Sequence, residues 1–157
     1  AGHGISRIAP ILQDIVMRLK EDPDQVVLNR VDLYWLIDDQ SYFEWFTKML
    51  KDLEEDSTSK FFNYHIHFLD RSPEDISEKM MYISTNISDK QTNLSLLDNL
   101  SDRTKFGIPN WEREFKALRS TINANDSKIF YSGPLQFSGA IKKQGKRLGF
   151  IFKKGSF

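Results

Sequence analysis

Two glycines that flank a histidine are the first residues suited to chemistry. Gly2-His3-Gly4 is followed by Ile5 and Ser6, and an apolar helical pattern begins at once. Glycines let a backbone approach phosphate oxygens closely, and the amides of a helix N-terminus point at an anion. This segment therefore suits a pyrophosphate, but many tight turns also contain two glycines. The residues alone leave both interpretations open.

Two further segments place polar or turn-forming residues at the end of an expected strand. Asp38 and Asp39 follow an apolar run that contains Trp35, and Ser132-Gly133-Pro134 follows a second run. An acid at a strand end can accept hydrogen bonds from a ribose, although two solvated loop acids are the commoner explanation. The second segment is also compatible with a turn and a helix-starting proline.

Two histidines, His65 and His67, alternate along one expected strand and so share a face. The chain has no cysteine, and no convincing third ligand lies near these two residues in the sequence. We therefore expect partly buried strand histidines and no metal site.

The elements that must position these residues alternate between strand and helix. Apolar, β-rich runs predict strands at 31–37, 61–69, 128–131 and 148–152, and a period of three to four predicts helices that end near Glu21 and Thr121. Further helices are expected at 41–53 and after Pro134. This order predicts an α/β fold with a doubly wound, mostly parallel sheet, whose ligands bind at the C-terminal ends of the strands.

Two segments depart from this regular order. Residues 70–106 are rich in Ser, Asn and Asp, which predicts an exposed, mobile insertion outside the sheet. The glycine turn at residues 2–6 would normally follow a strand, so we expect a sheet that lacks its first strand and a chain that is the C-terminal part of a longer protein.

Composition narrows the class of protein. The 157 residues suit a single domain, 1–157, and 39% of them are apolar, enough to bury a core. The 22 basic and 22 acidic residues cancel, which argues against nucleic acid as a partner. The absence of cysteine excludes disulfides, thiolate zinc sites and a cysteine nucleophile. No apolar run approaches the roughly 20 residues of a membrane span, so the composition predicts a soluble, globular, cytosolic domain.

Four segments, taken in order, carry a resemblance to a known family. They are Tyr34-Trp35-Leu36 with Phe43-Glu44-Trp45-Phe46, Phe106-Gly107-Ile108-Pro109-Asn110-Trp111 with Glu114-Phe115, Tyr131-Ser132-Gly133-Pro134, and Phe150-Ile151-Phe152 with the terminal Phe157. This series resembles the nucleotide-binding half of the catalytic chain of the NADPH oxidase family. That family includes the phagocyte oxidase, the dual oxidases and the plant respiratory burst oxidases, and it is related to the ferredoxin-NADP reductases.

The resemblance implies an NAD(P)H-binding domain of the ferredoxin-NADP reductase type. Such a domain takes NADPH or NADH and passes hydride to FAD, which a preceding domain mostly holds. Electrons then cross haem groups in a membrane domain and reduce oxygen to superoxide or hydrogen peroxide. The implied partners are the protein's own FAD and transmembrane haem domains, with regulatory subunits as further candidates. The implied location is the cytosolic face of a membrane.

The resemblance also assigns roles to residues. Ser132 stands at the family cysteine near the nicotinamide, and Phe157 at the terminal aromatic residue that stacks on the flavin; both are catalytic candidates. The cofactor-binding candidates lie in the turns and strand ends named above: Gly2, His3, Gly4, Ile5, Ser6, Trp35, Asp38, Asp39, Gly133 and Pro134.

Some positions depart from the family pattern. Asp38 and Ile108 replace two arginines that would grip the 2′-phosphate of NADPH, so we expect the preference for NADPH to be weakened or reversed. Arg103 and Lys105 are alternative phosphate contacts. These departures, with Ser132 in place of the family cysteine, leave open a non-catalytic domain kept for assembly or regulation. A third possibility is a ferric reductase of the same superfamily, with another electron acceptor.

Overall fold

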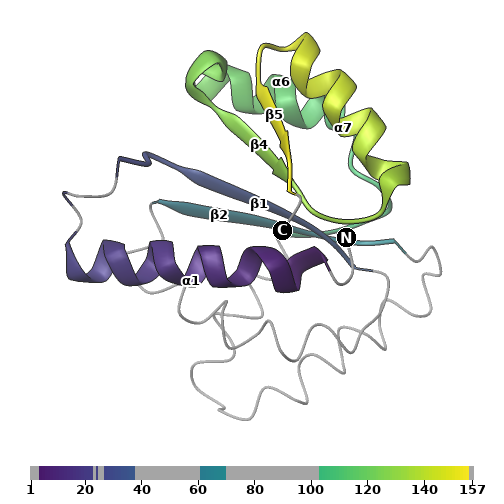
Figure 1. The fold of residues 1–157 in the computed structure, drawn as a ribbon. Helices are drawn as coiled ribbons and strands as arrows, with labels where there is room; N and C mark the ends of the chain where they lie inside the picture. The colour runs from purple at the N-terminus through teal and green to yellow at the C-terminus, as the bar shows by residue number, and fades with distance from the viewer. Residues whose placement is uncertain (1–3, 23, 25–26, 38–60, 70–102, 156–157) are drawn as a thin grey trace.

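The computed structural model describes residues 4–22, 24, 27–37, 61–69 and 103–155 of the chain. Within these residues helices alternate with strands along the chain (Figure 1). In chain order the elements are α1 (Ile5–Glu21), β1 (Val31–Ile37), β2 (Phe62–Phe68), β3 (Thr104–Phe106), α6 (Trp111–Thr121), a 3₁₀ turn (Ala124–Asp126), β4 (Lys128–Tyr131), α7 (Leu135–Arg147) and β5 (Ile151–Lys154).

The strands confirm the predicted α/β fold, with every described strand pair parallel. One sheet has the order β1-β2-β3, and β4 pairs with β5 in a second sheet. The register runs from Val31 opposite Phe62 to Ile37 opposite Phe68, and β4 pairs with β5 from Lys128 opposite Ile151. Within the described residues the strands thus divide between two sheets where the sequence predicted one, because β1 and β4 are not hydrogen-bonded to one another.

Strand β1 is packed on both faces, as a parallel strand between helices should be. Leu33, Trp35 and Ile37 lie in one buried cluster with residues of α1 and β2. Leu36 lies in a second cluster with residues of α6, α7, β4 and the segment before β5. Side chains alternate between the faces of a strand, so β1 joins the two clusters. Helix α1 covers one side of β1 and β2, and α6 and α7 lie on the other side (Figure 1).

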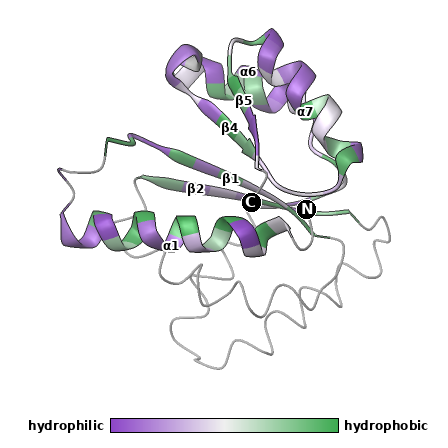
Figure 2. Ribbon diagram, in the orientation of Figure 1, coloured by the Kyte–Doolittle hydropathy of each residue, from purple (hydrophilic) through white to green (hydrophobic). Residues whose placement is uncertain are grey.

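Helix α1 follows the apolar period that the sequence predicted. Its buried residues are Ile5, Ala9, Leu12 and Val16, one turn apart. Hydrophobic and hydrophilic residues alternate along this helix in Figure 2, as an amphipathic helix on a sheet requires. Burying each large apolar side chain contributes about 1.5–3 kcal/mol. The packing of this one face therefore holds α1 against β1 and β2.

The predicted boundary of the last strand was wrong by three residues. The strand runs from Ile151 to Lys154, because residues 148–150 are still hydrogen-bonded to the end of α7. The amide of Leu148 donates to the carbonyls of Gln144 and Gly145, and the amide of Phe150 donates to Gly145 at 3.0 Å. Gly149 between them has a φ of 90°, which ends the helix.

The predicted insertion at 70–106 was wrong at its C-terminal end. Thr104–Phe106 forms β3, which pairs in parallel with Ile66, His67 and Phe68 of β2. Three residues are too few to show a period of two, so pairing with β2 and not local pattern creates this strand. The rest of the predicted insertion and the predicted helix at 41–53 lie outside the described residues.

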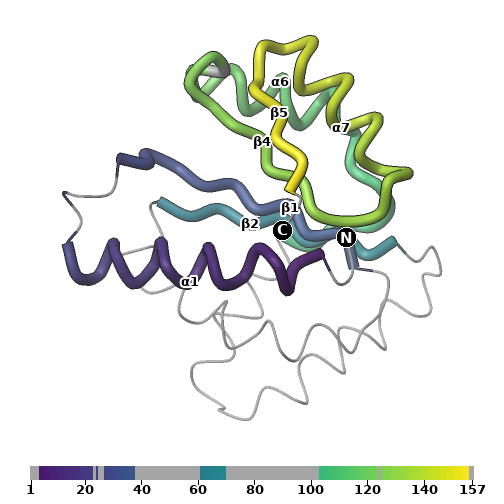
Figure 3. Tube along the Cα trace, in the orientation of Figure 1, coloured from purple at the N-terminus to yellow at the C-terminus, as the bar shows by residue number. Residues whose placement is uncertain are grey.

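The first turn of α1 and the ends of β1 and β5 lie at the same end of the molecule (Figure 3). This is the end at which parallel sheets bind ligands. None of the described helices is long and apolar enough to cross a membrane.

We expect the aromatic packing of α6 to dominate the stability of the second cluster. Phe115 is buried, with ring centroids 5.6 Å from Trp111 and 5.5 Å from Phe150. Phe115→Ala should lower the free energy of unfolding by about 3–5 kcal/mol. Phe130→Ala is the matched control, because Phe130 is 59% exposed on β4, and should change it by less than about 0.5 kcal/mol. Urea unfolding measures both, and equal losses would contradict this packing.

We also expect acid to destabilise the fold through the histidines of β2. Burial is the main reason that the pKa values of His65 and His67 lie below their ordinary value of 6.5. As the pH falls below about 6.5, the histidines of the unfolded chain take up protons before those of the folded chain. The free energy of unfolding is therefore highest above about pH 6.5, as far as these two groups determine it, and it decreases as the pH falls.

Urea midpoints at pH 7.5 and 5.5 test this expectation. The wild type should lose more stability between the two pH values than His65→Phe, which keeps a ring against Tyr34 but does not titrate. The ring centroids of Tyr34 and His65 are 4.4 Å apart, so the variant can preserve the stacking. An equal loss in both proteins would assign the acid sensitivity to other groups.

Candidate functional site

The glycine turn before α1 packs directly against the turn after β4. Gly4 is buried, and a Cβ atom on it would lie 2.3 Å from the carbonyl oxygen of Ser132 and 2.8 Å from its carbonyl carbon. The neighbours are backbone atoms, which cannot swing aside as the end of a side chain can. Only glycine therefore allows this approach. The structure thus brings together two turns that the sequence analysis had selected separately.

The N-terminus of α1 suits an anion. Gly4 occupies the N-cap position and makes no side-chain capping hydrogen bond, and the first turn contains no acidic residue. The first amides of a helix have no partner within the helix, and the helix dipole places partial positive charge there. The backbone of this turn can therefore donate to phosphate oxygens without repulsion from a carboxylate in the same turn.

The turn at Ser132-Gly133-Pro134 is held by the tyrosine before it. The Tyr131 hydroxyl donates a hydrogen bond to the carbonyl of Pro134, and the amide of Phe137 donates to the same carbonyl at 3.3 Å. Burial raises the pKa of the Tyr131 hydroxyl, which keeps it protonated as a donor. The amide of Gly155 donates to the carbonyl of Tyr131 at 3.0 Å, so β5 ends beside the same turn.

A second loop, from Gly107 to Asn110, joins β3 to α6 at the ends of the strands. The amide of Gly107 donates to the carbonyl of Phe68 at 2.7 Å, and Gly107 has a φ of 78°, which favours glycine. Pro109 is buried, and the Asn110 side chain accepts a hydrogen bond from the amide of Arg113 as the cap of α6. Ile108, between these fixed points, is 56% exposed.

A group of polar residues ties α6 to the first sheet behind this loop. The Tyr34 hydroxyl donates to Glu114 at 3.1 Å, and the Lys105 ammonium lies 3.5 Å from the other oxygen of that carboxylate. Burial, and then the charge of Glu114, raise the pKa of Tyr34. The Arg103 guanidinium lies 4.5 Å from the centre of the Tyr64 ring. Both alternative phosphate contacts thus already have protein partners.

Other predicted site residues differ in where the structure places them. Gly4 packs against Ser132 and Gly133 after β4, whereas Ile5 is buried in the cluster with β1 and β2 and Ser6 is exposed. Trp35 is only 2% exposed and packs in the cluster with α1, so it is a core residue, and its contact with a nucleotide stays a prediction. Gly2, His3, Asp38, Asp39 and Phe157 lie outside the described residues.

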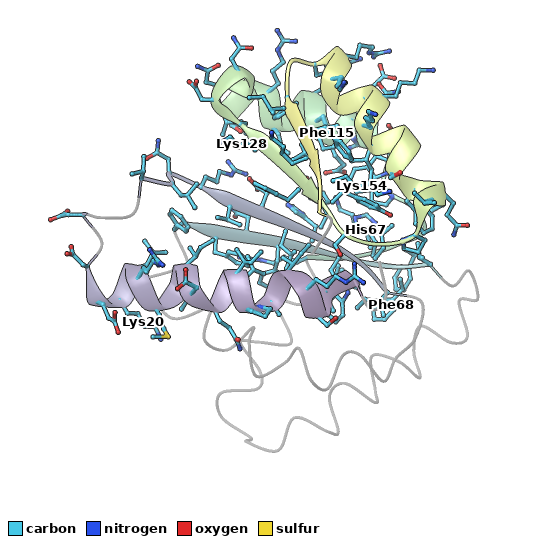
Figure 4. All side chains as sticks on the ribbon, in the orientation of Figure 1. Lys20, His67, Phe68, Phe115, Lys128 and Lys154 are labelled. Carbon is cyan, nitrogen blue, oxygen red and sulfur yellow. The ribbon has the colours of Figure 1, made fainter. Side chains whose placement is uncertain are left out.

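Sequence reasoning missed two residues that hold the loops. Tyr131 was selected only as part of a motif, and His67 only as a strand histidine. Figure 4 labels His67 and Phe68 at the end of β2, and the Nδ1 atom of His67 lies 3.1 Å from the carbonyl oxygen of Gly107. A side chain that bonds to a carbonyl 40 residues later leaves no local signal. Within the described ranges, no group of three or more His, Asp or Glu residues could hold a metal ion.

Comparison with known proteins identifies the family to which the chain is similar. Residues 1–146 match the family model described as the ferric reductase NAD binding domain. The chain is 29% identical over 147 residues to human NADPH oxidase 3, covering 91% of this chain and 25% of that protein.

Two further relatives show the same pattern. Identity is 29% over 146 residues to dual oxidase 1 of Rattus norvegicus, covering 91% of this chain and 9% of that protein. Human NADPH oxidase 5 is 24% identical over 178 residues, covering 100% of this chain and 23% of that protein. The chain therefore spans about a quarter of the two NADPH oxidases and a smaller part of the dual oxidase. With the parallel α/β fold and a family match over residues 1–146, the chain belongs to the NAD-binding domains of the ferric reductase and NADPH oxidase family.

Proposed function

We propose that this chain binds NADH or NADPH and delivers its hydride to FAD within a larger membrane flavocytochrome oxidase. The observation that supports the proposal is the packing of Gly4 against Ser132, which brings the start of α1 beside the turn at Ser132-Gly133-Pro134. A dinucleotide needs both features, namely amides for its pyrophosphate and a shaped surface for its nicotinamide.

The chain's own residues bind and orient the nucleotide in this proposal. The amides after Gly4 hold the pyrophosphate, and the close approach to Ser132 directs the nicotinamide half toward the end of β4. The Tyr131 bond to Pro134 keeps that turn in one place, which favours a fixed distance for hydride transfer. Phe157 would cover the flavin until the nicotinamide replaces it. When bound, FAD would supply a hydride acceptor, and haem would supply one-electron transfer to oxygen, giving superoxide or hydrogen peroxide.

The other parts of the oxidase are proposed partners. The chain spans 25% of human NADPH oxidase 3, so the proposal assigns FAD binding mostly, and haem binding entirely, to the protein's own further domains. This chain would then lie on the cytosolic face of the membrane. Regulatory subunits are further proposed partners.

A second candidate is a ferric reductase, because the matching family model carries that description. The two candidates share hydride transfer from NAD(P)H to FAD and differ in the final electron acceptor. Full-length protein in membranes, assayed with oxygen and with a ferric chelate, distinguishes them.

The proposed function predicts that nucleotide reduces the flavin and that Gly4 is required. In the full-length, flavin-loaded protein, anaerobic stopped-flow should show saturable flavin reduction by NADH and NADPH. Gly4→Ala should raise the KM by about tenfold or more, equivalent to about 1.4 kcal/mol, because its Cβ displaces the Ser132 backbone. Wild-type protein that binds neither nucleotide would contradict the proposal and favour the non-catalytic alternative.

Gly139→Ala is the control for this experiment. Gly139 is exposed within α7, and a Cβ atom there meets nothing within 4 Å. Alanine is favoured over glycine in a helix by roughly 0.5–1 kcal/mol, so this variant should be slightly more stable and keep its KM. A KM that rises equally in both variants would show that the effect is not the clash with Ser132.

The proposed function also predicts an altered nucleotide preference. Ile108 is exposed where the family places an arginine, so the wild type should use NADH at least as well as NADPH. Ile108→Arg should shift the ratio of kcat/KM toward NADPH by about tenfold to hundredfold, the effect of one charge-assisted hydrogen bond. Ile108→Gln, of similar length but uncharged, should shift it little. A tenfold or greater NADPH preference in the wild type would contradict the prediction.

A further inference from the structure

His67 is a buried residue that makes a hydrogen bond to the loop after β3. The residue is 3% exposed, and its Nδ1 atom lies 3.1 Å from the carbonyl oxygen of Gly107. A carbonyl oxygen can only accept, so Nδ1 must carry the proton. The Nε2 atom is buried and has no hydrogen-bond partner in the described part of the chain. The structure therefore selects one neutral tautomer of His67.

Two consecutive residues of β2 hold both peptide groups of Gly107. The Phe68 carbonyl accepts from the Gly107 amide at 2.7 Å, and the His67 ring bonds to the Gly107 carbonyl. The φ of 78° at Gly107 is then fixed from both sides. Beyond Ile108, the chain is held again by buried Pro109 and by the Asn110 cap. The direction in which Ile108 leaves the loop therefore depends on the plane of the Gly107 carbonyl.

We propose that His67 is a positioning residue for nucleotide binding, whose Nδ1–H bond to the Gly107 carbonyl sets where Ile108 meets the nucleotide. The inference rests on the proposed function, in which this loop faces the adenosine end of NADH or NADPH. It assigns His67 a part in affinity and not in hydride transfer, because the bond acts on the loop and not on the reacting atoms.

Burial is the main reason that the pKa of His67 lies below its ordinary value, and of the charged groups around the ring Lys105 lowers the pKa and Glu114 raises it. Lys105 is its register partner on β3, Glu114 reaches toward the same region from α6, and His65 shares its face of β2. A proton added to Nε2 would be a buried donor without an acceptor among the described residues. Burial therefore favours the neutral ring, and the Nδ1–H donor to the Gly107 carbonyl is present in the neutral and the charged ring alike.

Three variants in the full-length, flavin-loaded protein test the proposal. His67→Phe keeps a ring but removes the donor, and should raise the KM for NADH and NADPH about threefold to tenfold, with kcat nearly unchanged. His67→Asn can place an amide donor near the Nδ1 position and should restore the KM. His65→Phe, the control on the same face of β2, should leave the KM unchanged. Equal KM values for wild type and His67→Phe, or no rescue by His67→Asn, would overturn the proposal.

A further measurement separates this proposal from the proposed function. Hydrogen exchange of residues 106–110 without nucleotide should become faster in His67→Phe and not in His67→Asn, and unchanged exchange in His67→Phe would overturn the proposal. If the wild type binds no nucleotide, the proposed function fails, while the exchange result still decides whether His67 holds the loop. His67→Leu serves as the donor-free variant if His67→Phe does not fold.

Discussion

The burial of β1 on both faces is the constraint on which the rest of the structure depends. Trp35 and Leu36 are adjacent, yet they lie in different buried clusters, one with α1 and one with α6 and α7. A parallel strand can do this only if both faces are apolar, which its sequence of β-rich residues allows. The two layers are thus packed on one strand. Their loops therefore meet at one end of the molecule, where Gly4 touches Ser132.

Two aromatic donors fasten the loops at that end in the same manner. The Tyr131 hydroxyl donates to the Pro134 carbonyl in the turn that follows β4. The His67 ring, on β2, donates to the Gly107 carbonyl in the loop that follows β3, the strand paired with β2. In each case a core side chain holds a carbonyl of a loop near the surface. Loops often carry the binding residues of a protein, but their exposed backbone is more mobile than the helices and strands that they connect. Core donors of this kind position the loops while leaving residues such as Ile108 exposed.

The fold of this chain agrees with its family, but the side chains at two positions do not follow the family pattern. The fold, the glycine turn and the turn at residues 132–134 belong to an NAD-binding domain of the ferric reductase and NADPH oxidase family. Ile108 and Ser132, in contrast, supply neither the positive charge nor the thiol that the family resemblance leads one to expect at those positions. The NAD-binding fold is therefore present, while these two positions depart from the family pattern.

The sequence by itself determined the elements whose signal is local. The apolar runs at Val31–Ile37 and Lys128–Tyr131 and the period of α1 suffice, since each pattern is long enough to read. Only the tertiary structure decided the rest. β3 forms because it pairs with β2, and β5 begins late because α7 retains the amides of Leu148 and Phe150. The contacts of Gly4 with Ser132 and of His67 with Gly107 join distant residues. Contacts of this kind depend on how the layers pack. The periodicity of apolar residues within one segment does not indicate which distant segment will lie beside it.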